Sequence, residues 1–271
     1  MSFKIAYGAG HNDKTTRGIP ESMHKPRMNE WRLNDRVARY FAEAAAMYEN
    51  VELLRVDDPL GQKPVSLYGR CNEANTWGAD FFLSIHHNGG IKGGKGGGLC
   101  AFCYKEGTKA AEYRDEIYAT CLEDGGIKGN RSQPKQAYGF VVLAATKMPA
   151  VLMEYGFMDS TTDVPIILTD AFAKAQAYAT MRAIAKVANL KLKPENDPAN
   201  QKIYRVQVGA FNEKENALAQ LEQLKEAGFE GFIVEHILEQ AEEEQIEEET
   251  KEPAAEETAT ETEEEGKSND G

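Results

Sequence analysis

Short apolar runs alternate with amphipathic segments from the start of the chain to about residue 190. Five of the apolar runs predict strands, over residues 3–7, 51–56, 81–86, 99–104 and 150–154. The spacing of apolar positions between them predicts helices over residues 30–48, 67–77, 109–123 and 170–187. This alternation is typical of an α/β fold, and we expect a twisted, mostly parallel sheet flanked by helices.

The pattern changes after residue 190, so we expect residues 1–190 to form one domain. Two prolines mark residues 191–202 as a linker. Residues 203–238 predict a strand over 203–209, a helix over 213–227 and a second strand over 231–235, a small βαβ segment that is too short to bury much core by itself. Residues 239–271, rich in Glu, Thr and Ala, predict a disordered acidic tail.

Charge is distributed unevenly along the 271 residues, whose net charge is −13. Residues 239–271 contain 15 of the 44 acidic and 2 of the 31 basic residues, which leaves 29 of each in residues 1–238. The part expected to fold is therefore electrically balanced. Because it lacks an excess of basic residues, we expect no nucleic-acid partner.

The apolar runs are all much shorter than the roughly 18 residues that a membrane-spanning helix needs, so we expect no membrane insertion. The first residues lead directly into a strand pattern, without the basic and apolar regions of a secretory signal. We therefore expect synthesis in the cytoplasm without a signal peptide. The four cysteines fit a reduced protein better than a disulfide framework, and Cys100 and Cys103 fit core packing.

Histidines and carboxylates gather at the predicted ends of strands. His11 follows the first strand, and His86 and His87 end the third. Because ligands bind at the carboxyl ends of strands in open α/β sheets, we expect these imidazoles at one edge of the sheet. Glu30 begins the first long helix, and Glu154 ends the fifth strand, where a carboxylate is costly to bury without a partner.

Imidazole and carboxylate groups together are ligands that zinc favours. Two His and one Glu leave the fourth position open for catalysis, and a further carboxylate suits a general base. Each residue also has a simpler interpretation, since a histidine after a strand can be structural and a glutamate at a helix N-terminus is stabilised by the helix dipole. The pattern favours a zinc hydrolase without settling the role of each residue.

Four ordered motifs carry a closer resemblance, in residues 8–11, 28–34, 70–88 and 147–157. Together they make residues 3–189 similar to the zinc-dependent N-acetylmuramoyl-L-alanine amidase family of the amidase-3 type. The resemblance implies that His11, Glu30 and His86 bind Zn²⁺ and that Glu154 is the catalytic carboxylate. His87 stands where the family often has a small residue, and we expect it to face the opposite side of its strand.

The resemblance implies hydrolysis of the amide between N-acetylmuramic acid and L-alanine of the peptidoglycan stem peptide. The partner would be peptidoglycan, namely glycan strands with stem peptides, and the place of action the bacterial cell wall. The context would be that of a phage-type or prophage-type lysin, or of an autolysin. The sequence leaves the oligomeric state open.

A second resemblance covers residues 203–235, which look like the first half of a SPOR-type peptidoglycan-binding domain. Residues 89–98 contain seven glycines, and we expect a flexible loop beside the zinc site.

Two alternatives to the amidase function stay open. One is a zinc peptidase of the carboxypeptidase type, and the other is a wall-binding protein without catalytic activity.

Overall fold

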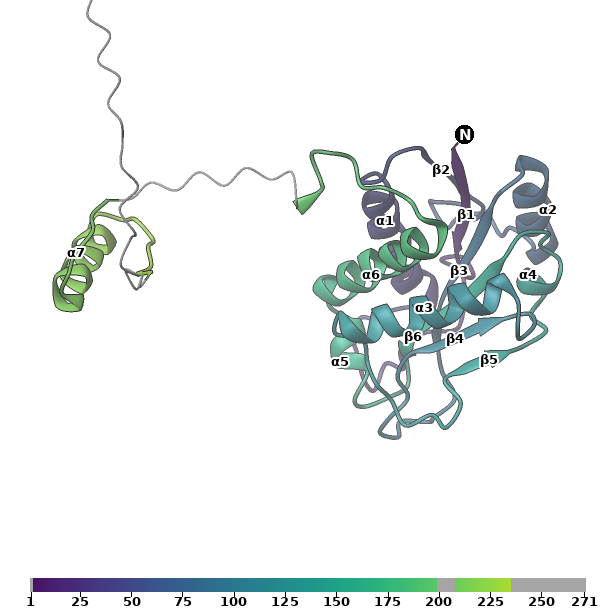
Figure 1. Cartoon of the computed structure of the whole chain (residues 1–271). Helices are drawn as coiled ribbons and strands as arrows, with labels where there is room; N and C mark the ends of the chain where they lie inside the picture. The colour runs from purple at the N-terminus through teal and green to yellow at the C-terminus, as the bar shows by residue number, and fades with distance from the viewer. Residues whose placement is uncertain (1, 199–207, 235–271) are drawn as a thin grey trace, which may run out of the picture. The chain divides into compact units, whose positions relative to one another are not determined.

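The computed structural model describes residues 2–198 and 208–234 (Figure 1). The chain divides into two compact units, residues 1–202 and 203–271, and each unit is described separately below. Within the described residues, no helix combines the length and apolar character needed to cross a membrane.

The first unit is built on one six-stranded sheet with the strand order β2-β1-β3-β6-β4-β5 (Figure 1). The strands are β1 (Phe3–Ala9), β2 (Val51–Arg55), β3 (Phe81–Asn88), β4 (Cys100–Cys103), β5 (Lys135–Ala137) and β6 (Ala150–Phe157). Strands β2, β1, β3 and β6 run parallel, while β4 pairs antiparallel with β6 and parallel with β5. The predicted α/β fold with a mostly parallel sheet is confirmed.

Helices cover both faces of this sheet. One face packs against α1 (Glu30–Ala45), α3 (Lys109–Glu123), α5 (Val164–Ile167) and α6 (Asp170–Ala188). The other packs against α2 (Leu67–Trp77) and α4 (Val141–Ala144). Alternate strand residues enter the two cores, with Ile5 and Tyr7 on the α1 side and Ala6 on the α2 side. This alternation follows from the two-residue period of a strand.

Side-chain caps mark the start of α1, α2 and α6. Asn29 precedes α1 in an extended conformation, and its side-chain oxygen accepts a hydrogen bond from the amide of Arg32 at 3.0 Å. Ser66 caps α2 and Thr169 caps α6 in the same way. A cap satisfies an amide that has no partner within the helix. The cap on α1 also fixes Glu30 as the first residue of its helix.

The elements that the sequence did not predict are short, namely β5, α4 and α5 with three or four residues each. Elements of this length contain too few residues for a regular spacing of apolar positions to be recognised.

The first residues of the expected linker pack on the first unit. The Glu49 amide donates to the Lys191 carbonyl and the Lys193 amide donates to the Met47 carbonyl, both at 2.9 Å.

The glycine-rich segment after β3 is a loop, as expected, and hydrogen bonds connect it to a distant turn. The Asp159 carboxylate accepts hydrogen bonds from the amides of Gly90 and Lys92 at 2.9 and 2.7 Å. Asp163 accepts from the Gly98 amide at 2.7 Å and is fully buried. Glycine is needed here because a Cβ on Gly98 would lie 2.2 Å from the backbone nitrogen of Gly129. The flexibility of this loop stays a prediction, and its composition did not reveal the hydrogen bonds to a distant turn.

The second unit contains α7 (Lys214–Glu226), which matches the predicted helix. The strand expected over residues 231–235 is wrong for residues 231–234, which form no strand. No residue of α7 is buried, and Phe229 and Phe232 are exposed, so the described residues 208–234 offer no packed surface for a strand to cover. Most of the strand predicted at residues 203–209, and all of the predicted acidic tail, lie outside the described residues.

Candidate metal centre

The candidate site lies where the carboxyl ends of β1, β3 and β6 meet the start of α1. His11 follows β1 after the tight segment at Gly10, while His86 lies near the end of β3. Glu154 lies in β6, and it pairs in register with His86 across the two strands. The structure therefore brings His11, Glu30, His86 and Glu154 to one edge of the sheet, as the sequence predicted.

Glu30 is the centre of the cluster, and its side chain is only 1% exposed. One carboxylate oxygen lies 3.1 Å from Nε2 of His11, and the other lies 3.0 Å from Nδ1 of His86. The three residues offer ligand atoms that all lie within 4.8 Å of one another. The two imidazole rings meet edge to face, with ring centres 5.3 Å apart. One ion could contact all three groups after small adjustments.

Arg17 is a further partner of this carboxylate. Its Nε donates to Glu30 Oε2 at 2.9 Å, and its backbone carbonyl accepts from the Glu30 amide at 3.0 Å. Burial opposes ionisation of Glu30, but hydrogen bonds from His11 and His86 outweigh it, so the pKa of Glu30 lies well below its usual range. The carboxylate is therefore ionised at neutral pH.

His86 and His87 face opposite sides of β3. His86 points to Glu30, and burial lowers the pKa of its imidazole. His87 points into the α1 side, where its Nδ1 lies 2.8 Å from Oδ1 of Asn34. His87 is 1% exposed, and burial lowers its pKa to about 3, so it remains neutral. The expected opposite orientation of His87 is confirmed by this geometry.

Glu154 carries the least satisfied polar atom of the site. Its Oε2 is buried and has no hydrogen-bond partner among the residues that the structure describes. Burial, and next the nearby negative charge of Glu30, raise the pKa of Glu154 well above its usual value, while Arg17 acts in the opposite direction. A buried carboxyl without a partner is costly and commonly marks a functional group.

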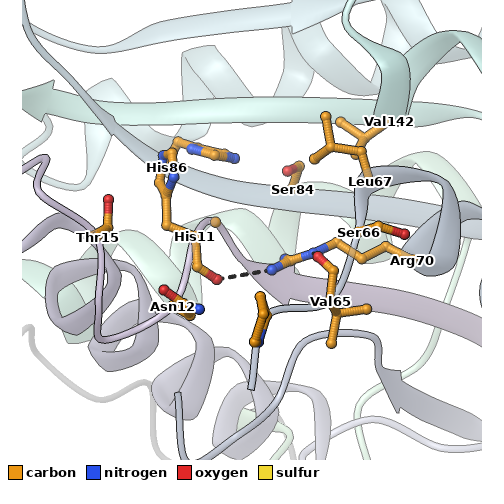
Figure 2. A pocket seen from close by; sticks show the side chains of 12 residues that line it. His11, Asn12, Thr15, Val65, Ser66, Leu67, Arg70, Ser84, His86 and Val142 are labelled. Carbon is orange, nitrogen blue, oxygen red and sulfur yellow. Dashed lines mark hydrogen bonds between the residues drawn. The ribbon is translucent and has the colours of Figure 1, made fainter. Parts of the chain in front are cut away.

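Two residues that the sequence did not assign to the metal site hold the histidines in place. Only glycine fits at position 10, because a Cβ there would lie 2.1 Å from Cε1 of His86. Arg70, on α2, is buried and donates to the carbonyls of Ala9 and His11 at 2.6 and 2.9 Å (Figure 2). These contacts show that Arg70 braces α2 against the loop after β1.

A cavity of about 320 Å³ opens beside the two histidines (Figure 2). The loop after β1 supplies His11, Asn12 and Thr15 to its wall, and α2 and α4 supply apolar side chains such as Leu67 and Val142. A cleft with apolar walls and a few polar groups at one end is the usual form of a ligand site.

All four cysteines are buried and unpaired, as the sequence predicted. Cys100 pairs in register with Glu154, so it contributes to the desolvated wall around the acid.

The sequence did not predict the contributions of Arg17 and Asn34 to the site. Asn34 stands one helical turn after Glu30, and that spacing could have indicated a residue above the same strand. Arg17 lies in an irregular loop, where no periodicity shows which residues meet.

Comparisons with known proteins agree with this geometry. Residues 5–186 match the protein-family model described as N-acetylmuramoyl-L-alanine amidase. N-acetylmuramoyl-L-alanine amidase CwlM of Bacillus licheniformis is 35% identical over 190 residues, which are 69% of this chain and 68% of CwlM. The sporulation-specific amidase of Bacillus subtilis is 33% identical over 192 residues, with 69% and 68% covered. An endolysin of Bacillus phage SPP1 is 29% identical over 128 residues, 47% of each chain.

Solved structures share the fold of the first unit. The amidase of Clostridium difficile 630 superposes with a TM-score of 0.62 at 19% identity, covering 69% of this chain and 97% of that one. The catalytic domain of CwlV from Bacillus (Paenibacillus) polymyxa gives 0.60 at 20% identity, covering 70% and 99%.

The α/β sheet with a histidine and carboxylate cluster at its edge thus defines an amidase catalytic domain. The chain belongs to the N-acetylmuramoyl-L-alanine amidase family, and it is a peptidoglycan hydrolase. Residues 171–235 also match the SPOR domain model. The first part of that match is α6, which packs in the core of the first unit, and the remainder continues beyond it.

The close approach of Gly10 to His86 gives a test of the site. We expect Gly10→Ala to fold but to bind zinc at least about 10-fold more weakly, because the new methyl group displaces the His86 ring. Zinc affinity is measured by competition with a chromophoric chelator, and folding by thermal unfolding. Gly139→Ala is the matched control, since its Cβ would meet nothing within 4 Å. Equal zinc affinities of the two variants would show that His86 is not a ligand.

Proposed function

We propose that this chain is a zinc-dependent amidase in which His11, Glu30 and His86 hold the metal and Glu154 is the catalytic carboxylate. The bond cleaved is the amide between N-acetylmuramic acid and L-alanine of the stem peptide. The observation that carries the proposal is the convergence of three ligand atoms within 4.8 Å of one another beside a buried acid without a hydrogen-bond partner.

The donor set fits zinc in chemistry and in protonation. Catalytic zinc sites commonly use three nitrogen or oxygen ligands and leave one position open. Ligands must be deprotonated to bind a metal. The lowered pKa values of Glu30 and His86 keep the carboxylate ionised and the imidazole neutral. Arg17 and the Asn29 cap support Glu30 from outside, as partners of metal ligands commonly do.

Zinc at this site supplies a Lewis acid that polarises the scissile carbonyl and makes the attacking water more acidic. Glu154 accepts a proton from that water at its carboxylate and delivers it to the amide nitrogen as the carbon–nitrogen bond breaks. The products are a lactyl carboxylate and a stem peptide with a free L-alanine amine. A carboxyl with a raised pKa suits this exchange, because it can hold the proton between the two steps.

The proposal also assigns a role to each part of the chain. Residues 1–190 carry catalysis, and residues 191–202 act as a linker. Residues 203–238 correspond to part of a SPOR domain, and the match of residues 171–235 to the SPOR model supports contact with peptidoglycan. The place of action is the bacterial cell wall. A wall-binding protein without activity fits less well, since the donor set and the buried acid are both intact.

Digestion of purified cell walls tests the function directly. We expect the zinc-loaded chain to release intact stem peptides that begin with a free L-alanine amine, as identified by mass spectrometry. A chelator should stop the release, and added zinc should restore it. Glu154→Gln should bind one zinc but lose about 10²-fold to 10⁴-fold in rate, because it can neither accept nor deliver the proton. Cleavage within the stem peptide would instead support a carboxypeptidase-type enzyme.

The neighbouring histidines provide a matched pair for the metal assignment. His86→Ala should lose stoichiometric zinc, since it removes a ligand. His87→Gln should keep zinc, because His87 points to Asn34 on the opposite side of the strand and glutamine can still donate to it. Metal content after dialysis is measured by elemental analysis. Retention of one zinc by His86→Ala, together with its loss from His87→Gln, would reverse the assignment.

A further inference from the structure

The segment between β1 and α1 is basic, although the chain up to residue 238 is neutral. Residues 12–29 contain four Lys and Arg residues against two Asp and Glu residues. The same segment supplies Asn12 and Thr15 to the wall of the cavity beside the histidines. The four cations are not part of the cavity wall, but they belong to the same segment as Asn12 and Thr15, and their charge favours an anionic group near this side of the cavity.

Arg17 is the cation of this segment that contacts the site itself. Its Nε is held by Glu30 at 2.9 Å, which fixes the position of the guanidinium. The side chain is 57% exposed, and its two terminal nitrogens make no hydrogen bond with any described residue. A guanidinium held in this way presents two nitrogens at a spacing that matches the two oxygens of a carboxylate.

Peptidoglycan stem peptides offer such a group near the scissile bond, because the residue that follows L-alanine can carry a free carboxylate or the corresponding carboxamide. We propose that Arg17 is a substrate-binding residue that recognises this carboxylate, so that the enzyme prefers stem peptides with an acidic second residue. This inference rests on the proposed function. It adds the substrate class that the site selects.

Two other roles of Arg17 make different predictions. If Arg17 only positioned Glu30, its loss would weaken zinc binding and slow every substrate by the same factor. If it stabilised negative charge on the scissile carbonyl oxygen, its loss would again slow all substrates equally. Recognition of a stem carboxylate changes the ratio between two substrates that differ in that group alone, and this ratio is unaffected by the other two roles.

The test compares two N-acetylmuramoyl tripeptide amides, L-alanyl-γ-D-glutamyl-L-lysinamide and L-alanyl-D-isoglutaminyl-L-lysinamide, in which the γ-carboxyl of the second residue is bonded to lysine and only its α-carboxylate or α-carboxamide differs. We expect the zinc-loaded full chain to prefer the carboxylate in kcat/KM by about 10-fold, a typical effect of one charged hydrogen-bonded pair at a partly exposed site. Arg17→Met should reduce the preference to less than about twofold, and Arg17→Lys should retain part of it. High salt should reduce the preference of the unmodified chain.

Lys14→Met is the matched control, because it removes one positive charge from the same segment without touching Glu30. It should keep the preference. A second measurement needs no turnover, namely calorimetric binding of both peptides to the Glu154→Gln variant, where the same ratio is expected in the dissociation constants. This measurement stands even if the chain cleaves a different bond.

Three results would overturn the proposal. The first is an unmodified chain without preference in either measurement. The second is a preference that survives Arg17→Met. The third is an equal loss of preference in Lys14→Met, which would assign the effect to the overall charge of the segment instead of to Arg17.

Discussion

One buried carboxylate organises this catalytic site. Glu30 is almost completely enclosed, yet it is ionised, because two imidazoles and a guanidinium surround it at hydrogen-bonding distance. A buried charge is tolerated only when partners replace the water that it has lost. The histidines, the loop after β1 and the first turn of α1 must therefore remain together, and the same requirement brings the three proposed metal ligands close to one point.

The sheet provides the precision of this arrangement. Parallel pairing sets His86 beside Glu154, and the two-residue period turns His87 away to the opposite core. A slip of one residue in β3 would exchange the two histidines and leave the carboxylate without its partner. Gly10 and Arg70 act on the same geometry, since one leaves room for the His86 ring and the other ties the His11 loop to α2.

The sequence was sufficient to predict the helices and strands whose apolar residues recur at a regular spacing. The long helices and the five longer strands begin and end close to where apolar spacing predicted, and capping by Asn29 explains the position of Glu30. The histidines and Glu154 could be placed at one edge of the sheet because the ends of parallel strands converge there, whereas the ligand roles were implied by the resemblance to the amidase family. These features depend on local pattern and on a general rule of topology.

Features that depend on contacts between distant loops could not be predicted. Asp159 and Asp163 hold the glycine-rich segment in place, although its composition indicated flexibility. Arg17 reaches Glu30 from an irregular segment with no period to reveal its direction. The strand expected over residues 231–235 had a suitable alternation, but the described part of it has no packed surface to cover. Local preference alone does not decide the structure of such segments.

The central claim is that the carboxylate of Glu30 and the imidazoles of His11 and His86 bind one zinc ion. X-ray absorption spectroscopy of the zinc-loaded chain tests it most directly, because it reports the atoms bonded to the metal. The account predicts four nitrogen or oxygen neighbours at about 2.0–2.2 Å, with two imidazoles among them. Sulfur at about 2.3 Å would place the metal at a cysteine instead, and a spectrum without imidazole would contradict the account.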